Sequence, residues 1–211
     1  MLLIGLTGGI ATGKSTASQH LTNSTPPIPI IDADLIARQV ITPHRPAYYS
    51  LVRHFGLQII NPETLEIDRA KLGAIVFSGD DVDGRQRKVL NGITHPDIRA
   101  EMLHCALKCF LRGERMCVLD TPLLFEAGLW KVVNVVMVVY CSEQAQLARL
   151  TARDSLTPTD AKSRIASQMP IDEKRQRADI LIDNSSATPD DMRAQLDAAA
   201  KAFGQGGGQG S

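Results

Sequence analysis

The sequence predicts an α/β fold in which a parallel sheet is flanked by helices. Short apolar runs rich in β-branched residues recur along the chain, as expected of buried strands. Segments with helical periodicity lie between them, which is the order of a parallel sheet wrapped by helices. The chain has 211 residues, of which 44% are hydrophobic, enough for a substantial core. We expect one domain over residues 1–203, with strands at Leu2–Thr7, Ile28–Ile31, Met116–Leu119, Val135–Tyr140 and Ile180–Ile182.

The first predicted strand leads into a phosphate-binding loop, "GGIATGKST". Gly8 and Gly13 bracket four residues and are followed by Lys14 and Ser15, which matches G-x-x-x-x-G-K-[ST]. In such a P-loop the backbone N–H groups point inward and are backed by a helix N-terminus. The lysine supplies charge for the β- and γ-phosphates of ATP, and the serine hydroxyl binds Mg²⁺. The predicted ATP-binding residues are Gly8, Gly9, Ala11, Thr12, Gly13, Lys14, Ser15 and Thr16.

Carboxylates follow two further strands, at the edge of the sheet where α/β proteins bind ligands. Asp32 and Asp34 come directly after "IPII". Asp32 is suited to capping the next helix, whereas a second carboxylate two residues on is less easily explained as a cap. Asp34 is therefore a candidate to accept a proton from a substrate hydroxyl near the γ-phosphate.

Asp120 directly follows the third predicted strand, as a Walker B carboxylate does. We expect Asp120 and Ser15 to bind Mg²⁺. The sequence "PLLFE" follows, beginning at Pro122. Its apolar residues are typical of a core, but the loop could also form the floor of a substrate pocket. Leu123 is the candidate for that second role.

A basic stretch separates the last two predicted strands and begins in a predicted helix at Glu143–Ala152. Such a run usually lies on a solvated helix face. Its position in a P-loop fold favours a mobile lid instead, over about residues 153–178, where arginines stabilise charge on the transferring phosphoryl group. We expect Arg149 and Arg153 to act catalytically in this way, and Arg164 to lie near the phosphates. The basic residues are Arg149, Arg153, Lys162, Arg164, Lys174, Arg175 and Arg177.

Asn184 follows the last predicted strand in "IDNSS". Its side-chain amide could read a purine edge of ATP, or it could end the strand in a turn. The residues themselves leave both alternatives open.

Composition excludes several classes of protein. A net charge of zero and an aromatic content of 4% do not suit a dedicated nucleic-acid binder. No apolar run approaches the roughly 20 residues of a membrane span, and the first residues resemble a strand rather than a targeting signal. We therefore expect a cytoplasmic protein, a monomer or weak oligomer, with small-molecule partners. A metal site at Cys105 and Cys109 beside His104 is possible, but the spacing favours cysteines that pack as small apolar residues.

A P-loop also serves GTPase switches and ATP-driven motors. The guanine-reading Asn-Lys-x-Asp tetrad does not occur in the sequence, and the D-x-x-G match at residues 81–84 lies in a polar loop. A motor usually needs sensor and partner elements for which this chain has little room. A small-molecule kinase is therefore the leading class, with a non-catalytic ATP-dependent switch as a distant alternative.

Motifs along the chain resemble the dephospho-CoA kinase family. They are "GLTGGIATGKST", "IDADLIARQV", "IDRAKLGAIVF", "LNGITHPDIR" and "LDTPLLFEAGL", followed by the basic stretch and "RADILIDNS". The resemblance runs from about Leu2 to Asn184. Ala11 and Thr12 replace a Gly-Ser pair that is frequent in the family, a change that keeps both side chains small.

The resemblance implies transfer of the ATP γ-phosphate to the ribose 3′-hydroxyl of dephospho-CoA, the last step of coenzyme A synthesis. It implies a catalytic role for Lys14 and makes Asp34 the base or orienting group. It places Arg38 and His95 on the acceptor side, together with Asp34, Leu123 and Arg164. A nucleoside or nucleotide kinase on the same scaffold is the alternative. We further expect a helical acceptor-binding insertion at about residues 34–112 and a flexible Gly-rich tail at residues 204–211.

Overall fold

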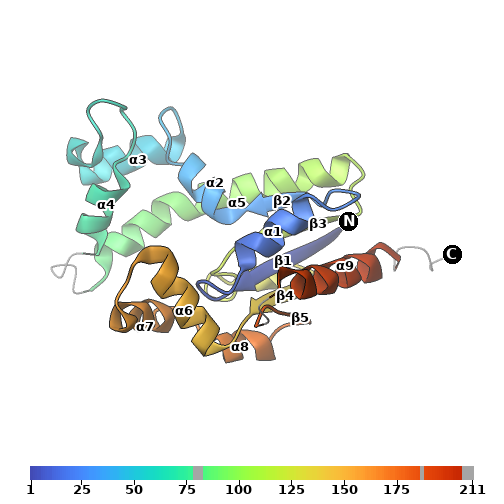
Figure 1. The fold of residues 1–211 in the computed structure, drawn as a ribbon. Helices are drawn as coiled ribbons and strands as arrows, with labels where there is room; N and C mark the ends of the chain where they lie inside the picture. Colours follow the sequence, from blue (N-terminus) through green and yellow to red (C-terminus); the bar gives the residue numbers. More distant parts are fainter. Residues whose placement is uncertain (78–82, 186–187, 206–211) are drawn as a thin grey trace. The chain divides into compact units, whose positions relative to one another are not determined.

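A computed structural model of the chain describes residues 1–77, 83–185 and 188–205 (Figure 1). The chain forms two compact units. One unit combines Met1–Asp32 with the chain from Ala106 onward and contains the sheet. The other unit is Ala33–Cys105, which is mainly helical.

The sheet has five strands in the order β2-β3-β1-β4-β5. All neighbouring strands are parallel, as the sequence predicts. Continuous burial along β1 and β4 explains why these strands are visible in the sequence as unbroken apolar runs. The third predicted strand gains Asp120 at its end, so this carboxylate lies at the carboxyl edge of the sheet. The strands are β1 at Leu2–Gly8, β2 at Ile30–Asp32, β3 at Met116–Asp120, β4 at Val135–Tyr140 and β5 at Ile180–Asp183.

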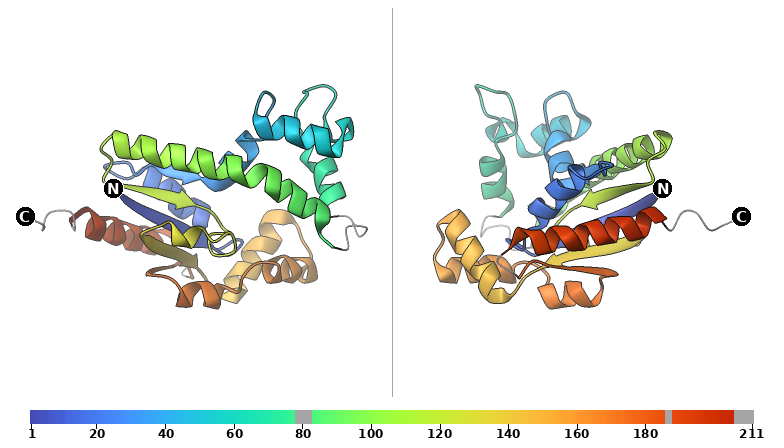
Figure 2. Two further views of the ribbon diagram at one scale, coloured as in Figure 1. Left: turned by 180° about the vertical axis from the view of Figure 1, so that it is seen from behind. Right: turned by 45° about the vertical axis from the view of Figure 1, so that its right-hand side comes forward.

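Two helices cover one face of this sheet: α1 at Lys14–Thr22 and α9 at Pro189–Gln205 (Figure 2). Their apolar side chains share a buried cluster with inward-facing residues of the strands. This packing fixes α1 at the end of β1, and with it the loop that joins them. The cluster contains Ile4, Leu6, Ala17, Leu21, Ile28, Val118, Met137, Val139, Ile182, Met192 and Leu196.

Three helices follow β4: α6 at Glu143–Asp154, α7 at Pro158–Ala166 and α8 at Ile171–Gln176. The hydroxyl of Ser142 accepts a hydrogen bond from the backbone N–H of Ala145, which caps α6. The cap explains why this helix begins where the sequence predicts, while its end extends two residues beyond Ala152. A 3₁₀ turn at Leu129–Lys131 lies between β3 and β4.

The second unit has its own core, built from helices and a 3₁₀ turn. Its largest buried side chains include Leu51, Phe55 and Ile59. The elements are α2 at Ala33–Gln39, α3 at Pro46–Phe55, the 3₁₀ turn at Leu57–Ile59, α4 at Arg69–Val76 and α5 at Arg85–Leu111, of which the residues from Ala106 onward belong to the sheet unit.

Two predicted segments fall partly outside the described residues. Gly204 and Gln205 end α9, and the rest of the predicted tail, residues 206–211, lies outside. Of the D-x-x-G match, residues 83 and 84 are described and precede α5. Among the helices that the structure describes, none is long and apolar enough to cross a membrane.

Candidate functional site

The P-loop joins the end of β1 to the start of α1, as its mechanism requires. Ala11 and Gly13 have φ values of 59° and 98°, and this left-handed backbone turns successive peptide groups into a nest for an anion. The hydroxyl of Thr12 is buried and donates to the carbonyl of Gly9 at 2.9 Å, which closes the turn. At Gly8 a Cβ would lie 2.5 Å from the carbonyl oxygen of Val139, so only glycine allows this close approach.

Lys14 and Asp120 are brought together at this loop. The Lys14 ammonium lies 2.5 Å from Oδ1 of Asp120, and the two side chains are 15% and 6% exposed. The contact follows from the topology, because β3 lies beside β1 and pairs Asp120 with Leu6. Lys14, the predicted phosphate-binding cation, therefore lies in direct contact with Asp120, the predicted metal-binding carboxylate.

The oxygen donors around this pair suit a magnesium ion. Asp120 is also in register with Asp32 on β2, so two carboxylates end adjacent strands. Ser15 and Thr16 lie exposed in the first turn of α1 and add hydroxyl oxygens. Carboxylate and hydroxyl oxygens are the hard ligands that Mg²⁺ prefers.

Asn184 contacts the P-loop rather than standing apart from it. Its Nδ2 donates to the carbonyl of Thr12 at 2.8 Å, and its backbone N–H donates to the carbonyl of Tyr140. The amide lies so close to Gly13 that a Cβ there would collide with it. This contact with the loop was not among the alternatives that the sequence left open for Asn184.

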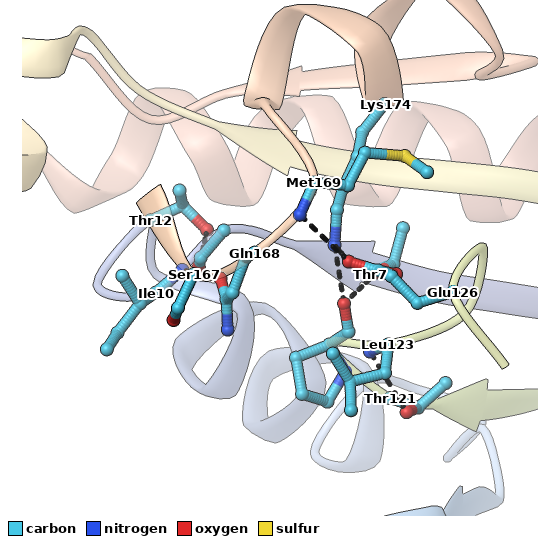
Figure 3. A network of polar contacts seen from close by, with 12 residues as sticks. Thr7, Ile10, Thr12, Thr121, Leu123, Glu126, Ser167, Gln168, Met169 and Lys174 are labelled. Carbon is cyan, nitrogen blue, oxygen red and sulfur yellow. Dashed lines mark hydrogen bonds and ion pairs between the residues drawn. The ribbon is translucent and has the colours of Figure 1, made fainter. Parts of the chain in front are cut away.

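Two glutamines that sequence reasoning missed also hold the P-loop. The backbone N–H of Ile10 donates to Oε1 of Gln168 at 2.9 Å, and Nε2 of Gln146 donates to the carbonyl of Ile10 at 2.8 Å. Gln146 comes from α6. Gln168 comes from the connection between α7 and α8 (Figure 3). No pattern in the sequence marks them, because each contact spans well over a hundred residues.

Lys174 lies within the segment that the sequence predicts as a lid, but it is buried. Its side chain is fully buried, and its ammonium donates to the carbonyl of Pro122 at 2.6 Å and pairs with Glu126 at 3.0 Å (Figure 3). The hydroxyl of Thr7 donates to the same carbonyl. Burial alone would raise the pKa of Glu126, but hydrogen bonds from backbone N–H groups, including that of Met169, and from Lys174 hold this pKa below its ordinary value.

The three predicted lid arginines differ in their surroundings. Arg153 and Arg164 are exposed and share one carboxylate, with Nε of Arg153 2.7 Å and Nη1 of Arg164 3.1 Å from Asp154. These contacts hold the pKa of Asp154 below its ordinary range. Arg149 is half-buried on α6, and its buried Nη1 has no hydrogen-bond partner among the described residues.

The predicted acceptor-side residues lie in both units. Asp34 and Arg38 are exposed on α2, and His95 is exposed on α5 directly before Pro96. In the sheet unit, Leu123 is 45% exposed, whereas Leu124 and Phe125 beside it are buried. Leu123 is therefore no core residue, which leaves its side chain available to a substrate.

A cavity of about 610 Å³ borders the P-loop on the side of α6, α7 and α8. Its lining includes Gly9, Gln146, Lys162, Gln168 and Arg175. Both polar and apolar side chains line it, the two glutamines among them. A pocket of this size suits a small organic ligand.

Three of the four cysteines are packed as small apolar residues. None of the four forms a disulfide, and Cys109, Cys117 and Cys141 are buried. Burial, reinforced by the neighbouring Cys109, raises the pKa of Cys117 to about 12. Within the described residues no three or more histidine, cysteine, aspartate or glutamate side chains are grouped so that they could hold a metal ion by themselves.

Comparison with known proteins identifies the family. The family model described as dephospho-CoA kinase matches residues 2–190. The chain belongs to the dephospho-CoA kinase family. A dephospho-CoA kinase of Shouchella clausii is 46% identical over 198 residues, covering 94% of this chain and 97% of the relative. A dephospho-CoA kinase domain-containing protein of Danio rerio is 47% identical over 197 residues, covering 93% and 83%.

Solved structures agree with this family. The dephospho-CoA kinase of Campylobacter jejuni has a TM-score of 0.63 and 28% identity, and the match covers 95% of this chain and 96% of that one. The Thermus thermophilus protein TT1252 has a TM-score of 0.79 and 26% identity, with the same coverage. The parallel sheet with flanking helices is thus the fold of a P-loop kinase, as predicted.

Proposed function

We propose that this chain, an ATP-dependent kinase by family, transfers the γ-phosphate of ATP to the ribose 3′-hydroxyl of dephospho-CoA, giving coenzyme A and ADP. The contact of Lys14 with Asp120 at the mouth of the P-loop carries the proposal, because it gathers the cation and the carboxylate that phosphoryl transfer requires. Family membership then selects the acceptor.

The P-loop and its neighbours bind the donor. Inward N–H groups and the N-terminus of α1 hold the β-phosphate, and Lys14 exchanges its carboxylate partner for the β- and γ-phosphates. Asp120 and Ser15 would hold Mg²⁺, which would neutralise charge on the phosphates. Asn184 contributes to the ATP site through the loop that it contacts.

Asp34 accepts the proton of the acceptor hydroxyl. The 3′-oxygen forms a bond to the γ-phosphorus, the bond from that phosphorus to the bridging oxygen breaks, and ADP leaves with the electron pair. Arg38, His95, Leu123 and Arg164 bind the acceptor. The exposure of all five side chains supports this assignment.

Arg149 and Arg153 stabilise charge on the transferring phosphoryl group. Arg149 supports this assignment most strongly, because a buried guanidinium donor without a partner in the described chain is costly unless a ligand accepts from it. Arg153 would leave Asp154 for the phosphates when the lid, predicted over about residues 153–178, closes in its part before Gln168, which stays bonded to the P-loop. Closure excludes water, which is the competing acceptor.

A cytoplasmic location and a monomeric or weakly associating chain stay predictions from the sequence. Light scattering on a size-exclusion column tests the second. A mass corresponding to one chain of 22.9 kDa at micromolar concentration is the expected result.

An acceptor panel tests the proposed function. Purified chain with ATP and Mg²⁺ is offered dephospho-CoA, adenosine, AMP or shikimate, and ADP formation is followed. Dephospho-CoA should give a kcat/KM at least about a hundredfold above that of any other acceptor, the discrimination available to a site with several polar contacts. Preference for a nucleoside or nucleotide would replace the proposal by the alternative kinase.

The Asp34→Asn variant tests the base. It should bind ATP normally and lose turnover by about 10²- to 10⁴-fold, the range for a positioned proton acceptor. Glu63→Gln, an exposed carboxylate of the same unit, is the control and should keep its turnover. Near-normal turnover of Asp34→Asn would show that Asp34 is not the proton acceptor.

A further inference from the structure

Ile10 is the one P-loop residue whose two backbone polar groups are both bonded to side chains from outside the loop, among the contacts of the described residues. Oε1 of Gln168 accepts from its N–H, and Nε2 of Gln146 donates to its carbonyl. Gln146 is 3% exposed, so water does not replace its contact. We call these two side chains the amide clamp.

The polarity of the clamp is fixed by the backbone. An N–H group can only donate and a carbonyl can only accept, so Gln168 must present oxygen and Gln146 must present nitrogen. A glutamate at 168 keeps the required acceptor, whereas a glutamate at 146 puts a carboxylate opposite a carbonyl oxygen. Similar substitutions therefore have opposite consequences at the two positions.

The clamp also sets the direction of the next peptide group. A trans peptide is planar, so its carbonyl and the following N–H point to opposite sides. When Gln146 holds the carbonyl of Ile10 outward, the N–H of Ala11 is directed the other way. Asn184 acts likewise on the carbonyl of Thr12 and the N–H of Gly13.

Gln168 is itself held in place by its neighbours in the chain. The backbone N–H of Met169 donates to Oε1 of Glu126 at 3.2 Å, and Glu126 pairs with the buried Lys174 (Figure 3). The connection between α7 and α8 is thus attached both to the P-loop and to the loop that follows Asp120. A side chain fixed at both ends can orient a peptide group without a large entropic cost.

We propose that Gln146 and Gln168 are positioning residues for phosphoryl transfer, which hold Ile10 so that the P-loop presents its N–H groups to the phosphates. The proposal rests on the proposed function for its turnover readout. Neither glutamine contacts substrate in it; both act through the loop backbone. The ligand concerned is the nucleotide, so the affinity for ADP is a second readout that needs no acceptor.

The test compares Gln146→Glu, Gln146→Met, Gln168→Glu and Gln168→Met. Both glutamate variants bring one negative charge to Ile10, and the uncharged methionine variants separate the loss of the hydrogen bond from the cost of burying that charge at the more buried position 146. We expect Gln168→Glu to keep a kcat at least about tenfold above that of Gln146→Glu, the scale of leaving a buried polar group unpaired. The methionine variants should each lose about tenfold, with the KM for dephospho-CoA changed less than about threefold.

Gln144→Glu and Gln144→Met are the matched controls, because Gln144 is exposed on the same helix as Gln146. Both should retain the turnover of the unaltered chain. Melting temperatures are measured for all six variants, and Gln146→Met keeps the test open if Gln146→Glu does not fold. Equal impairment of the two glutamate variants, or full turnover in both methionine variants, would overturn the proposal.

Calorimetric titration with ADP separates this inference from the proposed function. If the unaltered chain forms no coenzyme A, the proposed function fails, and the clamp is judged by ADP affinity alone. The order should be the same, with Gln168→Glu binding ADP more tightly than Gln146→Glu. An ADP affinity that does not differ among the four variants would contradict the clamp whatever the acceptor.

Discussion

The P-loop and the arginine-bearing region of α6 and α7 are held in opposite ways. Around the P-loop the contacts are short, neutral and buried, with Thr12 at 0% and Gln146 at 3% exposure. In the other region the side chains of Arg153 and Arg164 are more than half exposed, and both pair with Asp154. Buried hydrogen bonds fix the shape of the P-loop, whereas the other region holds its arginines in exposed ion pairs.

The difference indicates which contacts can be exchanged during the reaction. An exposed ion pair is screened by solvent and contributes little to stability, so Arg153 can leave Asp154 for a phosphate at little cost. Breaking a buried hydrogen bond and leaving its partner unpaired costs about 1 to 3 kcal/mol, so the P-loop keeps its shape. Lys14 combines both features, because it is largely buried but paired with a carboxylate at the phosphate site.

Replacement of Lys14 should have the largest effect. In Lys14→Ala the phosphates lose their main charge partner inside the loop, and we expect turnover to fall at least about 10³-fold. Circular dichroism should show an unchanged fold. Lys201→Ala, which removes an exposed lysine from α9, is the control. Turnover above a tenth of normal in Lys14→Ala would show that the loop geometry alone suffices.

Replacement of Arg153 tests the other region. Arg153→Ala should lower kcat by about 10²-fold, the effect of removing one group that stabilises the transition state. The KM for dephospho-CoA should change less, because the charge develops on the phosphoryl group. Arg193→Ala removes a similarly exposed arginine, which pairs with Asp190 on α9. This control should leave kcat unchanged. A rise in that KM without loss of kcat would make Arg153 an acceptor-binding residue instead.

The Glu126–Lys174 pair gives the smallest effect, on stability. Glu126→Gln leaves the buried ammonium of Lys174 poorly compensated, and we expect a loss of about 2 kcal/mol in urea unfolding at pH 7. Glu173→Gln removes an exposed pair with Arg177 on α8 and should cost less than about 0.5 kcal/mol. Equal losses in the two variants would contradict the distinction between buried and exposed contacts.

The same pair predicts a dependence on pH. The pKa of Glu126 is lowered on folding, so its contribution is complete above its ordinary value of 4.5 and is lost as the pH falls through the lower folded value. The difference in stability between the unaltered chain and Glu126→Gln should therefore shrink below pH 4.5. A difference that stays constant from pH 7 to pH 3.5 would show that the ion pair does not contribute.

The sheet and the P-loop could be predicted because both leave local patterns. A strand buried on both faces is an unbroken apolar run, and Val135–Tyr140 was predicted with its observed bounds. The turn of the loop backbone requires its glycines, and binding of the phosphates requires its lysine, so both residue types are recognisable in the sequence. The exposure of Leu123 could be established only from the structure, because nothing in the sequence "PLLFE" distinguishes the exposed leucine from the buried one that follows it.

The residues that support the loop could not be predicted for a physical reason. Gln146 lies on an otherwise amphipathic helix, and Gln168 lies in a connection; their common partner, Ile10, is 136 and 158 residues away. Lys174 stands between charged residues in "DEKRQR", where nothing distinguishes a buried lysine from its exposed neighbours. Such contacts depend on tertiary packing, which periodicity does not record.

The most direct test of the account follows ADP and coenzyme A together in one reaction, with ATP, Mg²⁺ and dephospho-CoA, for the unaltered chain and for Lys14→Ala. The account predicts one coenzyme A for each ADP in the unaltered chain, little ADP when dephospho-CoA is omitted, and neither product from Lys14→Ala. ADP formation that does not depend on dephospho-CoA, or that exceeds coenzyme A severalfold, would contradict it.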